Sequence, residues 1–441
     1  MDAPLLRTLA DVVGPAHCLA GTDRGPFVVE GRTPGAVVFP GTVEEAARVV
    51  RVAAEAGVPV IPWGGGTAMS LGAPPPDGAL VVATRRLDRL VEHEPGDLTA
   101  TVEAGSTLDA LQAALGRRGQ WLPLDPPQPA RATVGGVLAT NAAGPRRHGY
   151  GTARDVVIGM RVVGADGALV RAGGKVVKNV AGYDLAKLYV GALGSLGLIV
   201  DVTLKLRPRP EADEVVAATF VDVSAAARAA GACLALSLTP HAVEVATPGT
   251  VAIPGLGPGA VLLVGFDGLP AAVTWQGDEA ARLFRAEGAT AVQRLPGPAG
   301  ATTLAGLADL GATAPDPMAV AEAGVPPADV GPYLVDAEVT ARASGLSLRA
   351  AARAGEGIVT LVLGANGSRR DGRAAVRALG ALRERARASG GHLTVHRAPL
   401  GVRQAVGTWD PPGPVLGLMQ ALKQRLDPGG VLNPGRFVGG L

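Results

Sequence analysis

Two glycine-rich segments are the parts of the chain best suited to bind a phosphate. Residues 63–70 contain three consecutive glycines, and residues 133–144 place Gly135 and Gly136 just after Thr133, which can cap a short helix. Glycine has no Cβ, so its backbone amide can approach an anion closely, and free amides at a helix start favour phosphate. We therefore predict that the two turns hold a diphosphate between them, in one shared cleft.

The pair of turns, rather than either turn alone, carries this prediction. An isolated glycine triplet is more often a simple tight turn. Neither segment matches the G-x-G-x-x-G pattern of the Rossmann fold or the G-x-x-x-x-G-K-[ST] pattern of the P-loop. Both of those nucleotide-binding folds are therefore poor explanations.

The elements around the first turn form a β-α-β unit. Residues 37–40 suit a strand, and Thr42 with Glu45 forms a capping box for a helix that Gly57 ends. Residues 58–61 suit a second strand, which runs into the glycines. Further strands are expected at 80–83 and 98–102, a helix from 106 to 119, an extended proline-rich connector at 123–129, a hairpin at 156–170, and a strand at 197–208 whose apolar residues alternate.

The pattern changes after residue 209. Strands at 215–221, 243–246, 261–266, 358–363 and 393–395, with helices at 225–236, 278–287 and 373–388, suit a ferredoxin-like α+β layer. Residues 291–331 show weak periodicity and suit a long surface connection, and no internal repeat is evident. The expected domains are residues 1–209 (core about 30–209), residues 210–400, and a C-terminal segment, 401–441, that returns to the first domain.

Composition narrows the functional classes. The net charge of +2 and the lack of a basic run argue against nucleic-acid binding as the primary function. Two cysteines are too few for this chain to hold an iron–sulfur cluster by itself. No signal peptide or apolar run of about 20 residues is visible. A cytoplasmic protein without a transmembrane segment is expected.

The motifs together resemble one flavoprotein family. Residues 62–67, residues 133–151, residues 178–197 and the ending 432–437 are similar to the FAD-binding motifs of the family of vanillyl-alcohol oxidase and p-cresol methylhydroxylase (PCMH). Within that family the sequence looks most like the smaller FAD-binding subunit of bacterial glycolate oxidase. The resemblance covers residues 36–209 and about the last 15.

The resemblance implies an α+β fold, with a PCMH-type two-subdomain FAD-binding domain and a ferredoxin-like cap that faces the substrate. It also implies FAD, bound non-covalently because the first loop lacks the His or Cys that some relatives use. By the same analogy, the backbone near Gly197 and Ile199 would hold the adenine end. The cofactor-binding residues it implies are Trp63, Gly64, Gly65, Gly66, Thr67, Ala68, Met69, Thr133, Gly135, Gly136, Thr140, Asn141, Gly144, Tyr150, Gly151, Gly197 and Ile199.

The sequence departs from the larger, catalytic type of subunit in this branch. Those subunits carry a His-x-His and a Gly-Asp-Gly-Asn metal motif, and neither string occurs here. Leu193 stands where they usually have an acidic residue. His392 and His396 are four residues apart on an expected strand, but two ligands do not make a metal site. No metal is predicted.

The resemblance implies an FAD-dependent oxidoreductase subunit acting on glycolate or a similar 2-hydroxyacid. The implied partners are a larger FAD subunit and an iron–sulfur subunit, through which the chain could associate peripherally with a membrane. A stand-alone D-lactate or 2-hydroxyacid dehydrogenase and a scaffold without flavin remain as alternatives. The candidates for carboxylate binding or proton transfer are Arg147, His148, Tyr150, Lys178 and Tyr183.

Overall fold

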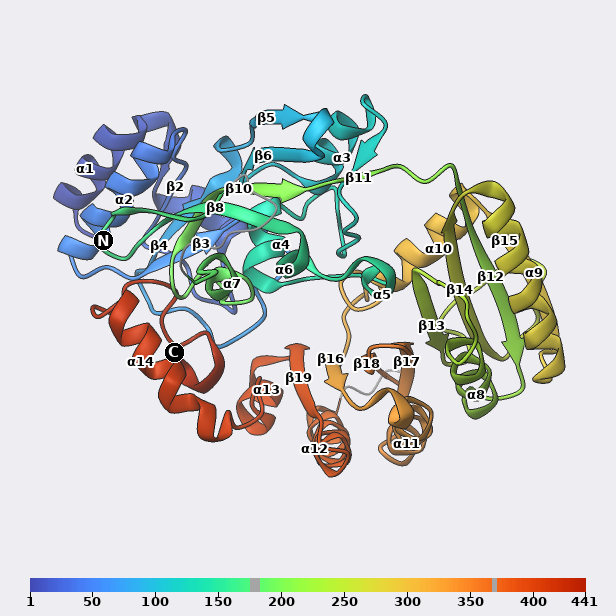
Figure 1. Ribbon diagram of the computed structural model, residues 1–441. Helices are drawn as coiled ribbons and strands as arrows, with labels where there is room; N and C mark the ends of the chain where they lie inside the picture. The colour runs from blue at the N-terminus through green and yellow to red at the C-terminus, as the bar shows by residue number, and fades with distance from the viewer. Residues whose placement is uncertain (175–182, 367–370) are drawn as a thin grey trace. The chain divides into compact units, whose positions relative to one another are not determined.

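The computed structural model describes residues 1–174, 183–366 and 371–441. The chain divides into two compact units (Figure 1). Unit 1 comprises Met1–Ala142, Thr152–Arg209 and Pro411–Leu441, and unit 2 comprises Ala143–Gly151 and Pro210–Asp410. The predicted boundary after residue 209 coincides with the end of the second stretch of unit 1. The C-terminal return to unit 1 begins at Pro411 rather than at residue 401, and Ala143–Gly151 is grouped with unit 2.

The first sheet of unit 1 is the predicted β-α-β unit with two added strands. Its order is β1-β2-β4-β3, and β4 runs parallel to both β2 and β3. Helix α2 begins after Thr42, whose hydroxyl accepts from the Glu45 amide, while the Glu45 carboxylate accepts from Gly41 N at 2.7 Å. The capping-box prediction is confirmed in its first half, and the buried face of α2 packs with α1. The elements are α1 (Ala3–Val13), β1 (Cys18–Leu19), β2 (Ala36–Val38), α2 (Val43–Glu55), β3 (Val60–Trp63) and β4 (Leu80–Ala83).

The second sheet of unit 1 is antiparallel, with the order β5-β6-β10-β8-β9. The predicted alternating strand is its centre, β10, and both of its faces are buried. The polar residues on it have partners inside the sheet: Asp201 pairs with Arg161, and Thr203 bonds to Thr101 at 3.0 Å. The elements are β5 (Leu90–Glu94), β6 (Thr99–Glu103), α3 (Leu108–Gly116), β7 (Gln120–Trp121), α4 (Val134–Thr140), α6 (Ala153–Val156), β8 (Val157–Val163), β9 (Leu169–Gly173), α7 (Ala186–Tyr189), β10 (Leu198–Lys205), β11 (Arg207–Pro208) and α14 (Leu416–Leu426).

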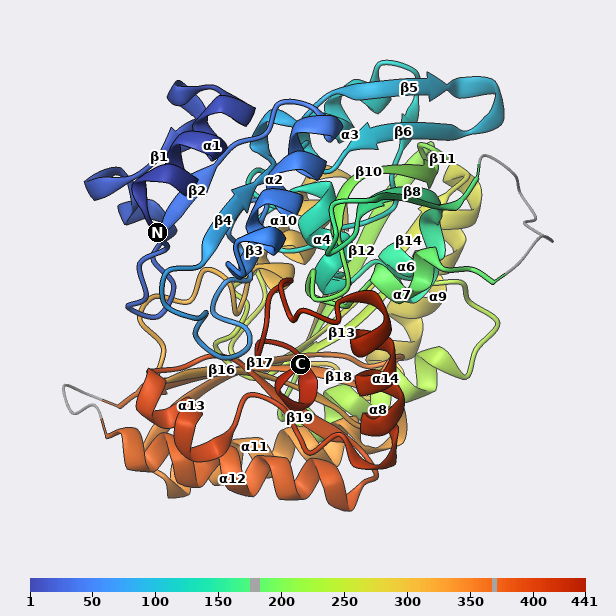
Figure 2. The same ribbon diagram turned by 90° about the vertical axis from the view of Figure 1, so that its left-hand side faces the viewer.

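Unit 2 is built on one antiparallel eight-stranded sheet, ordered β15-β12-β14-β13-β17-β18-β16-β19. The chain passes twice through the same β-α-β-β-α-β sequence, and the two halves join through β13 and β17. Helices α8, α9, α11 and α12 share one core with one face of the sheet, and Figure 2 shows α11 and α12 side by side below their strands. Helix α10 packs on the opposite face.

The bounds in unit 2 are α5 (Arg147–Tyr150), β12 (Ala212–Phe220), α8 (Val223–Leu234), β13 (Ala242–Ala246), β14 (Ala260–Gly268), α9 (Pro270–Ala286), β15 (Ala291–Pro296), α10 (Pro298–Ala308), β16 (Ala319–Gly324), α11 (Val330–Ala343), β17 (Leu346–Arg353), β18 (Ile358–Ala365), α12 (Gly372–Ala388), β19 (His392–Arg397) and α13 (Leu400–Val406). The ferredoxin-like α+β prediction is confirmed, but it described half of what is present. In the part of the chain that the structure describes, no helix is long and apolar enough to cross a bilayer.

One prediction for this half of the chain is wrong. Residues 291–331 are not a surface connection, because they contain β15, α10 and β16. The repeated β-α-β-β-α-β topology of unit 2 has no visible repeat in the sequence. One cause is the composition of β16, Ala-Val-Ala-Glu-Ala-Gly, whose alternation carries little hydrophobic contrast.

Candidate functional site

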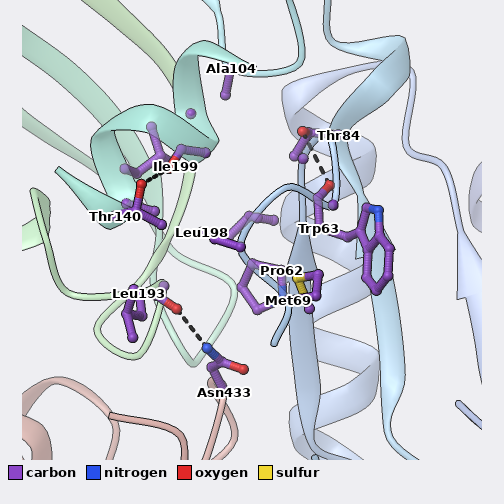
Figure 3. Close-up of a pocket in the computed structure, with 18 of the residues that line it drawn as sticks. Pro62, Trp63, Met69, Thr84, Ala104, Thr140, Leu193, Leu198, Ile199 and Asn433 are labelled. Atoms are coloured by element: carbon purple, nitrogen blue, oxygen red, sulfur yellow. Dashed lines mark hydrogen bonds between the residues drawn. The ribbon is translucent and has the colours of Figure 1, made fainter. Parts of the chain in front are cut away.

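Both glycine segments line a single pocket within unit 1 (Figure 3). The shared cleft that the sequence predicted is therefore present. Twelve of the predicted residues line it: Trp63, Gly64, Gly65, Gly66, Thr67, Ala68, Met69, Gly135, Gly136, Thr140, Gly197 and Ile199. The other lining residues, which sequence reasoning did not name as site residues, are Pro62, Leu71, Thr84, Ala104, Ala139, Leu193, Gly194, Leu198, Asn433 and Arg436.

The first turn follows β3 and presents its backbone to the pocket. Within the described residues, no backbone amide from Gly64 to Ala68 donates a hydrogen bond to another group of the chain. A backbone amide left without an acceptor needs water or a ligand, because an unpaired donor is costly. Successive free amides on small residues make a concave site for an anion. This turn has the property that the sequence predicted for it.

The second turn differs from its prediction. The Gly135 amide donates to Ala104 O at 2.8 Å, and the Gly136 amide donates to the Thr133 hydroxyl at 3.2 Å. The prediction that these amides point outward and are free is wrong. Thr133 does cap α4, as expected, but the hydroxyl of the cap uses one of the two amides. The second turn contributes a surface of small residues rather than donors.

The two turns are packed directly against each other. A Cβ atom added at Gly64 would lie 2.2 Å from the Thr133 hydroxyl, and one at Gly65 would lie 1.7 Å from the Arg131 carbonyl oxygen. Real Cβ atoms do not approach other atoms so closely. Glycine is therefore required at both positions to let the first turn reach the start of the second.

The remaining walls come from residues 193–199 and from the end of the chain. Asn433 donates from Nδ2 to Leu193 O at 2.6 Å, and Arg436 donates from Nη2 to Met69 O at 2.7 Å and to Leu71 O at 2.9 Å. The sequence contained a signal for these residues, because the ending 432–437 was one of the motifs. A local motif of this kind does not show which atoms its side chains contact.

Five predicted cofactor residues do not line this pocket. Thr133 caps α4 and lines a neighbouring surface pocket, and Asn141 ends α4 with a φ of 50°. Gly144, Tyr150 and Gly151 belong to the segment that is grouped with unit 2.

That segment, Ala143–Gly151, is held in unit 2 by charged side chains. The Arg146 guanidinium pairs with Asp213 and, at 3.3 Å, with Asp267. The Tyr150 hydroxyl donates to Asp267 at 2.7 Å. Arg146 is only 9% exposed, so this is a largely desolvated network. Its contacts are structural in kind, because each charge is matched within the unit.

The same network contains the one group of potential metal ligands found in the described part of the chain. One ligand atom each from Asp213, His241 and Asp267 lie within 4.8 Å of one another. Burial raises the pKa of Asp213, but the hydrogen bond with His241 and the charge of Arg146 outweigh it and hold that pKa below its usual value. The guanidinium already supplies a cation to both carboxylates. The arrangement is a buried ion pair rather than a vacant metal site.

The catalytic candidates are dispersed. His148 Nδ1 lies 2.5 Å from Glu356 Oε1. Burial by itself would raise the pKa of Glu322, but the charges of Arg353, His396 and Arg147 together outweigh it and lower that pKa. Lys178 lies outside the described residues. Tyr183 is 91% exposed.

Comparison with known protein families gives two matches. The family described as FAD binding domain matches residues 34–173, and the family described as FAD linked oxidases, C-terminal domain, matches residues 209–437. The first match contains both glycine turns. The second covers more than half of the chain.

Curated relatives match over part of their length. The chain is 37% identical over 212 residues to glycolate oxidase subunit GlcD of Bacillus subtilis (strain 168), covering 48% of this chain and 45% of that protein. It is 41% identical over 155 residues to glycolate oxidase subunit GlcE of Escherichia coli (strain K12), covering 35% and 44%. A D-lactate dehydrogenase of Archaeoglobus fulgidus is 36% identical over 216 residues, covering 49% and 48%. The matches span less than half the length of each of these relatives.

Solved structures share the fold over nearly the whole chain. An alkyldihydroxyacetonephosphate synthase superposes with a TM-score of 0.78 at 18% identity, covering 99% of this chain and 86% of that one. A p-cresol methylhydroxylase superposes with a TM-score of 0.76 at 19% identity, covering 98% and 96%. The PCMH-type α+β fold predicted from the sequence is confirmed.

Proposed function

We propose a function from the premise that this chain belongs to the FAD-linked oxidases, whose C-terminal domain matches residues 209–437. The chain is an FAD-dependent oxidoreductase subunit that acts on the hydroxyl-bearing carbon of a short 2-hydroxyacid, with glycolate as the first candidate. The observation that carries the proposal is the run of amides at Gly64–Ala68 that have no acceptor within the described chain, in a pocket that also has apolar lining residues.

The residues of this pocket fit a dinucleotide. Amides from Gly64 to Ala68 would hold the diphosphate, since they lack acceptors of their own. Ala104, Ala139 and Leu198 offer apolar walls for rings and exclude water. Bound FAD would supply the acceptor for a hydride from the substrate carbon, while the protein supplies orientation and electrostatics.

We further propose that the FAD is bound without a covalent link. The residues that line the described pocket include no histidine and no cysteine. Cys18 is on β1, at the edge of the sheet opposite β3, and Cys233 is buried in the core of unit 2. A covalent attachment needs a nucleophilic side chain beside the ring, and the described lining offers none of these two kinds.

The proposed partners are a larger FAD subunit and an iron–sulfur subunit, with possible peripheral attachment to a membrane through them. Two relatives carry names of glycolate oxidase subunits, which motivates a complex. The chain's two cysteines cannot ligate a cluster, so electrons leaving the flavin would need a cluster or another acceptor outside this chain. We also propose a cytoplasmic location for the chain.

The test is dye reduction by the purified full chain with glycolate or D-lactate, alone and after co-expression with a larger FAD subunit and an iron–sulfur subunit. Activity with glycolate that appears only with the partners is the expected result. Dye reduction by the chain alone, with D-lactate, would favour the stand-alone dehydrogenase. A colourless chain that binds no added FAD would contradict both enzyme proposals and would favour a scaffold protein without flavin.

A further inference from the structure

The C-terminal segment of unit 1 is fastened to the elements that carry the pocket. Val60 of β3 donates to Val431 O at 2.7 Å, and the Asn433 amide donates back to Val60 O at 2.8 Å. The Asp427 carboxylate is 2% exposed and accepts from the amides of Val431 and Leu432, at 2.8 Å each. The segment therefore extends the sheet edge from which the first glycine turn leaves.

A buried ion pair connects this segment to the loop on the other side of the pocket. Lys423 Nζ lies 2.6 Å from Asp427 Oδ2 and also donates to Leu432 O and Ser195 O, at 2.8 Å each. All three donors of the ammonium are thereby used. Lys423 does not line the pocket, so its role is to position the segment against residues 193–197.

Asn433 is the residue that this bracing places in the pocket wall. It is 7% exposed, and its φ of 43° lies in the left-handed region, which asparagine tolerates. Its Nδ2 faces the Leu193 carbonyl, which can only accept, so Oδ1 must face the opposite side (Figure 3). That oxygen is buried and has no donor within the described residues.

We propose that Asn433 is a cofactor-binding residue, whose Oδ1 accepts a hydrogen bond from an N–H or O–H group of bound FAD. The cofactor has such donors on its isoalloxazine ring, its sugar hydroxyls and its adenine. A buried carbonyl oxygen without a donor is unfavourable, and a ligand donor removes that penalty on binding. This inference rests on the proposed cofactor and adds a contact from the far end of the chain.

The test compares Asn433→Gly with Gln128→Gly in the full chain after removal of flavin. Both positions have positive φ, 43° and 54°, so glycine suits both backbones, but Gln128 does not line the pocket. FAD affinity is measured by quenching of flavin fluorescence, and the stability of the flavin-free protein by thermal melting. We expect Asn433→Gly to weaken FAD binding about tenfold or more, as for one lost hydrogen bond. Gln128→Gly should leave the affinity unchanged.

Lys423→Met distinguishes a direct contact of Asn433 with FAD from the positioning of the C-terminal segment. It keeps the Asn433 side chain and removes the Lys423–Asp427 ion pair. We expect it to lower the melting temperature of the flavin-free protein more than Asn433→Gly does, and to weaken FAD binding less. The contact is refuted if Asn433→Gly binds FAD within twofold of the unaltered protein. It is also refuted if the two variants lose the same FAD affinity for each degree by which their melting temperatures fall. An unaltered chain that binds no FAD would instead refute the proposed function.

If Asn433→Gly does not fold, Asn433→Asp takes its place, because aspartate also tolerates the left-handed backbone. A carboxylate cannot donate to Leu193 O, and it adds negative charge beside a cofactor that carries a diphosphate. We expect FAD binding at least tenfold weaker than in the unaltered chain. Unchanged affinity in this variant would overturn the proposal.

Discussion

The two glycine turns look alike in sequence and use their glycines differently. In the first turn the amides from Gly64 to Ala68 have no acceptor within the described chain. In the second turn the amides of Gly135 and Gly136 are already satisfied by Ala104 O and the Thr133 hydroxyl. Glycine allows an anion to approach the backbone, and it equally allows two parts of a protein to approach each other. The two roles of glycine are distinguished by whether the backbone amides of the turn have acceptors within the chain.

The continuation of the second turn supports a structural role for it. Helix α4 leads into Ala143–Gly151, which is anchored in unit 2 through Arg146, Asp213 and Asp267. We therefore propose that the second turn is part of the framework and that the first turn supplies the phosphate-binding donors. The following changes test that division, from the largest expected effect to the smallest.

Arg146→Met should produce the largest loss of stability. It removes the guanidinium and leaves Asp213 and Asp267 buried together without their shared cation. Breaking a buried ion pair from one side typically costs about 3–5 kcal/mol. Urea unfolding measures the change, with Arg154→Met, on an exposed residue of α6, as the control expected within about 0.5 kcal/mol of the unaltered protein. A loss no larger than that of the control would show that the network is not a structural anchor.

Gly65→Ala should abolish flavin retention. The new methyl group would lie 1.7 Å from the Arg131 carbonyl oxygen, so the turn must move and its amides lose their convergence. We expect FAD affinity to fall more than about 100-fold, or roughly 2.7 kcal/mol. The ratio of flavin to protein absorbance measures it, against Gly96→Ala, where nothing lies within 4 Å of the added Cβ. A yellow, fully loaded Gly65→Ala protein would break the comparison.

Gly135→Ala should reduce stability more than binding. Its Cβ would lie 2.7 Å from the Ala104 Cβ and 3.0 Å from the Ala104 carbonyl oxygen, and neither atom belongs to the first turn. Overpacking of this kind costs about 1–3 kcal/mol. Thermal melting and flavin fluorescence on one preparation separate the two effects. If the affinity for FAD falls as far as in Gly65→Ala while stability is unchanged, the second turn is also a phosphate-binding turn.

The smallest effect is the pH dependence contributed by Asp213. Its pKa is lowered in the folded protein, so the stabilisation is present above the unfolded value, about 3.9, and is lost as pH falls through the folded value. Asp213→Asn should be less stable at neutral pH and should lose less stability on acidification below about pH 4. Urea midpoints at several pH values measure this, with Asp109→Asn on the exposed face of α3 as the control. Parallel curves for the Asp213→Asn protein and the unaltered protein would contradict the linkage.

The sequence predicted best those features that depend on local pattern. The capped helix α2, the strand β10 and the cap at Thr133 each follow from residues within a few positions of one another. The shared pocket was predicted from two such local signals. The prediction for residues 291–331 failed in part because the alanine-rich strand β16 has weak hydrophobic contrast, although it pairs with β18 in a definite register.

The features that sequence reasoning missed depend on contacts between distant positions. Ala104 takes the Gly135 amide, and Leu193 takes the Asn433 side chain across 240 residues. Tyr150 and His148 have hydrogen-bond partners at Asp267 and Glu356, more than 100 residues away in the chain, and no local pattern indicates either partner. Which donors are used within the chain is a property of the folded structure.

Amide hydrogen exchange, followed by mass spectrometry with and without FAD, tests the central claim most directly. Peptides covering residues 63–69 should exchange quickly in the flavin-free chain and slowly when FAD is saturating, because the ligand supplies the missing acceptors. Peptides covering residues 134–138 should be protected in both states, since their amides are bonded within the chain. If saturating FAD leaves the exchange of residues 63–69 unchanged, the first turn does not hold the diphosphate.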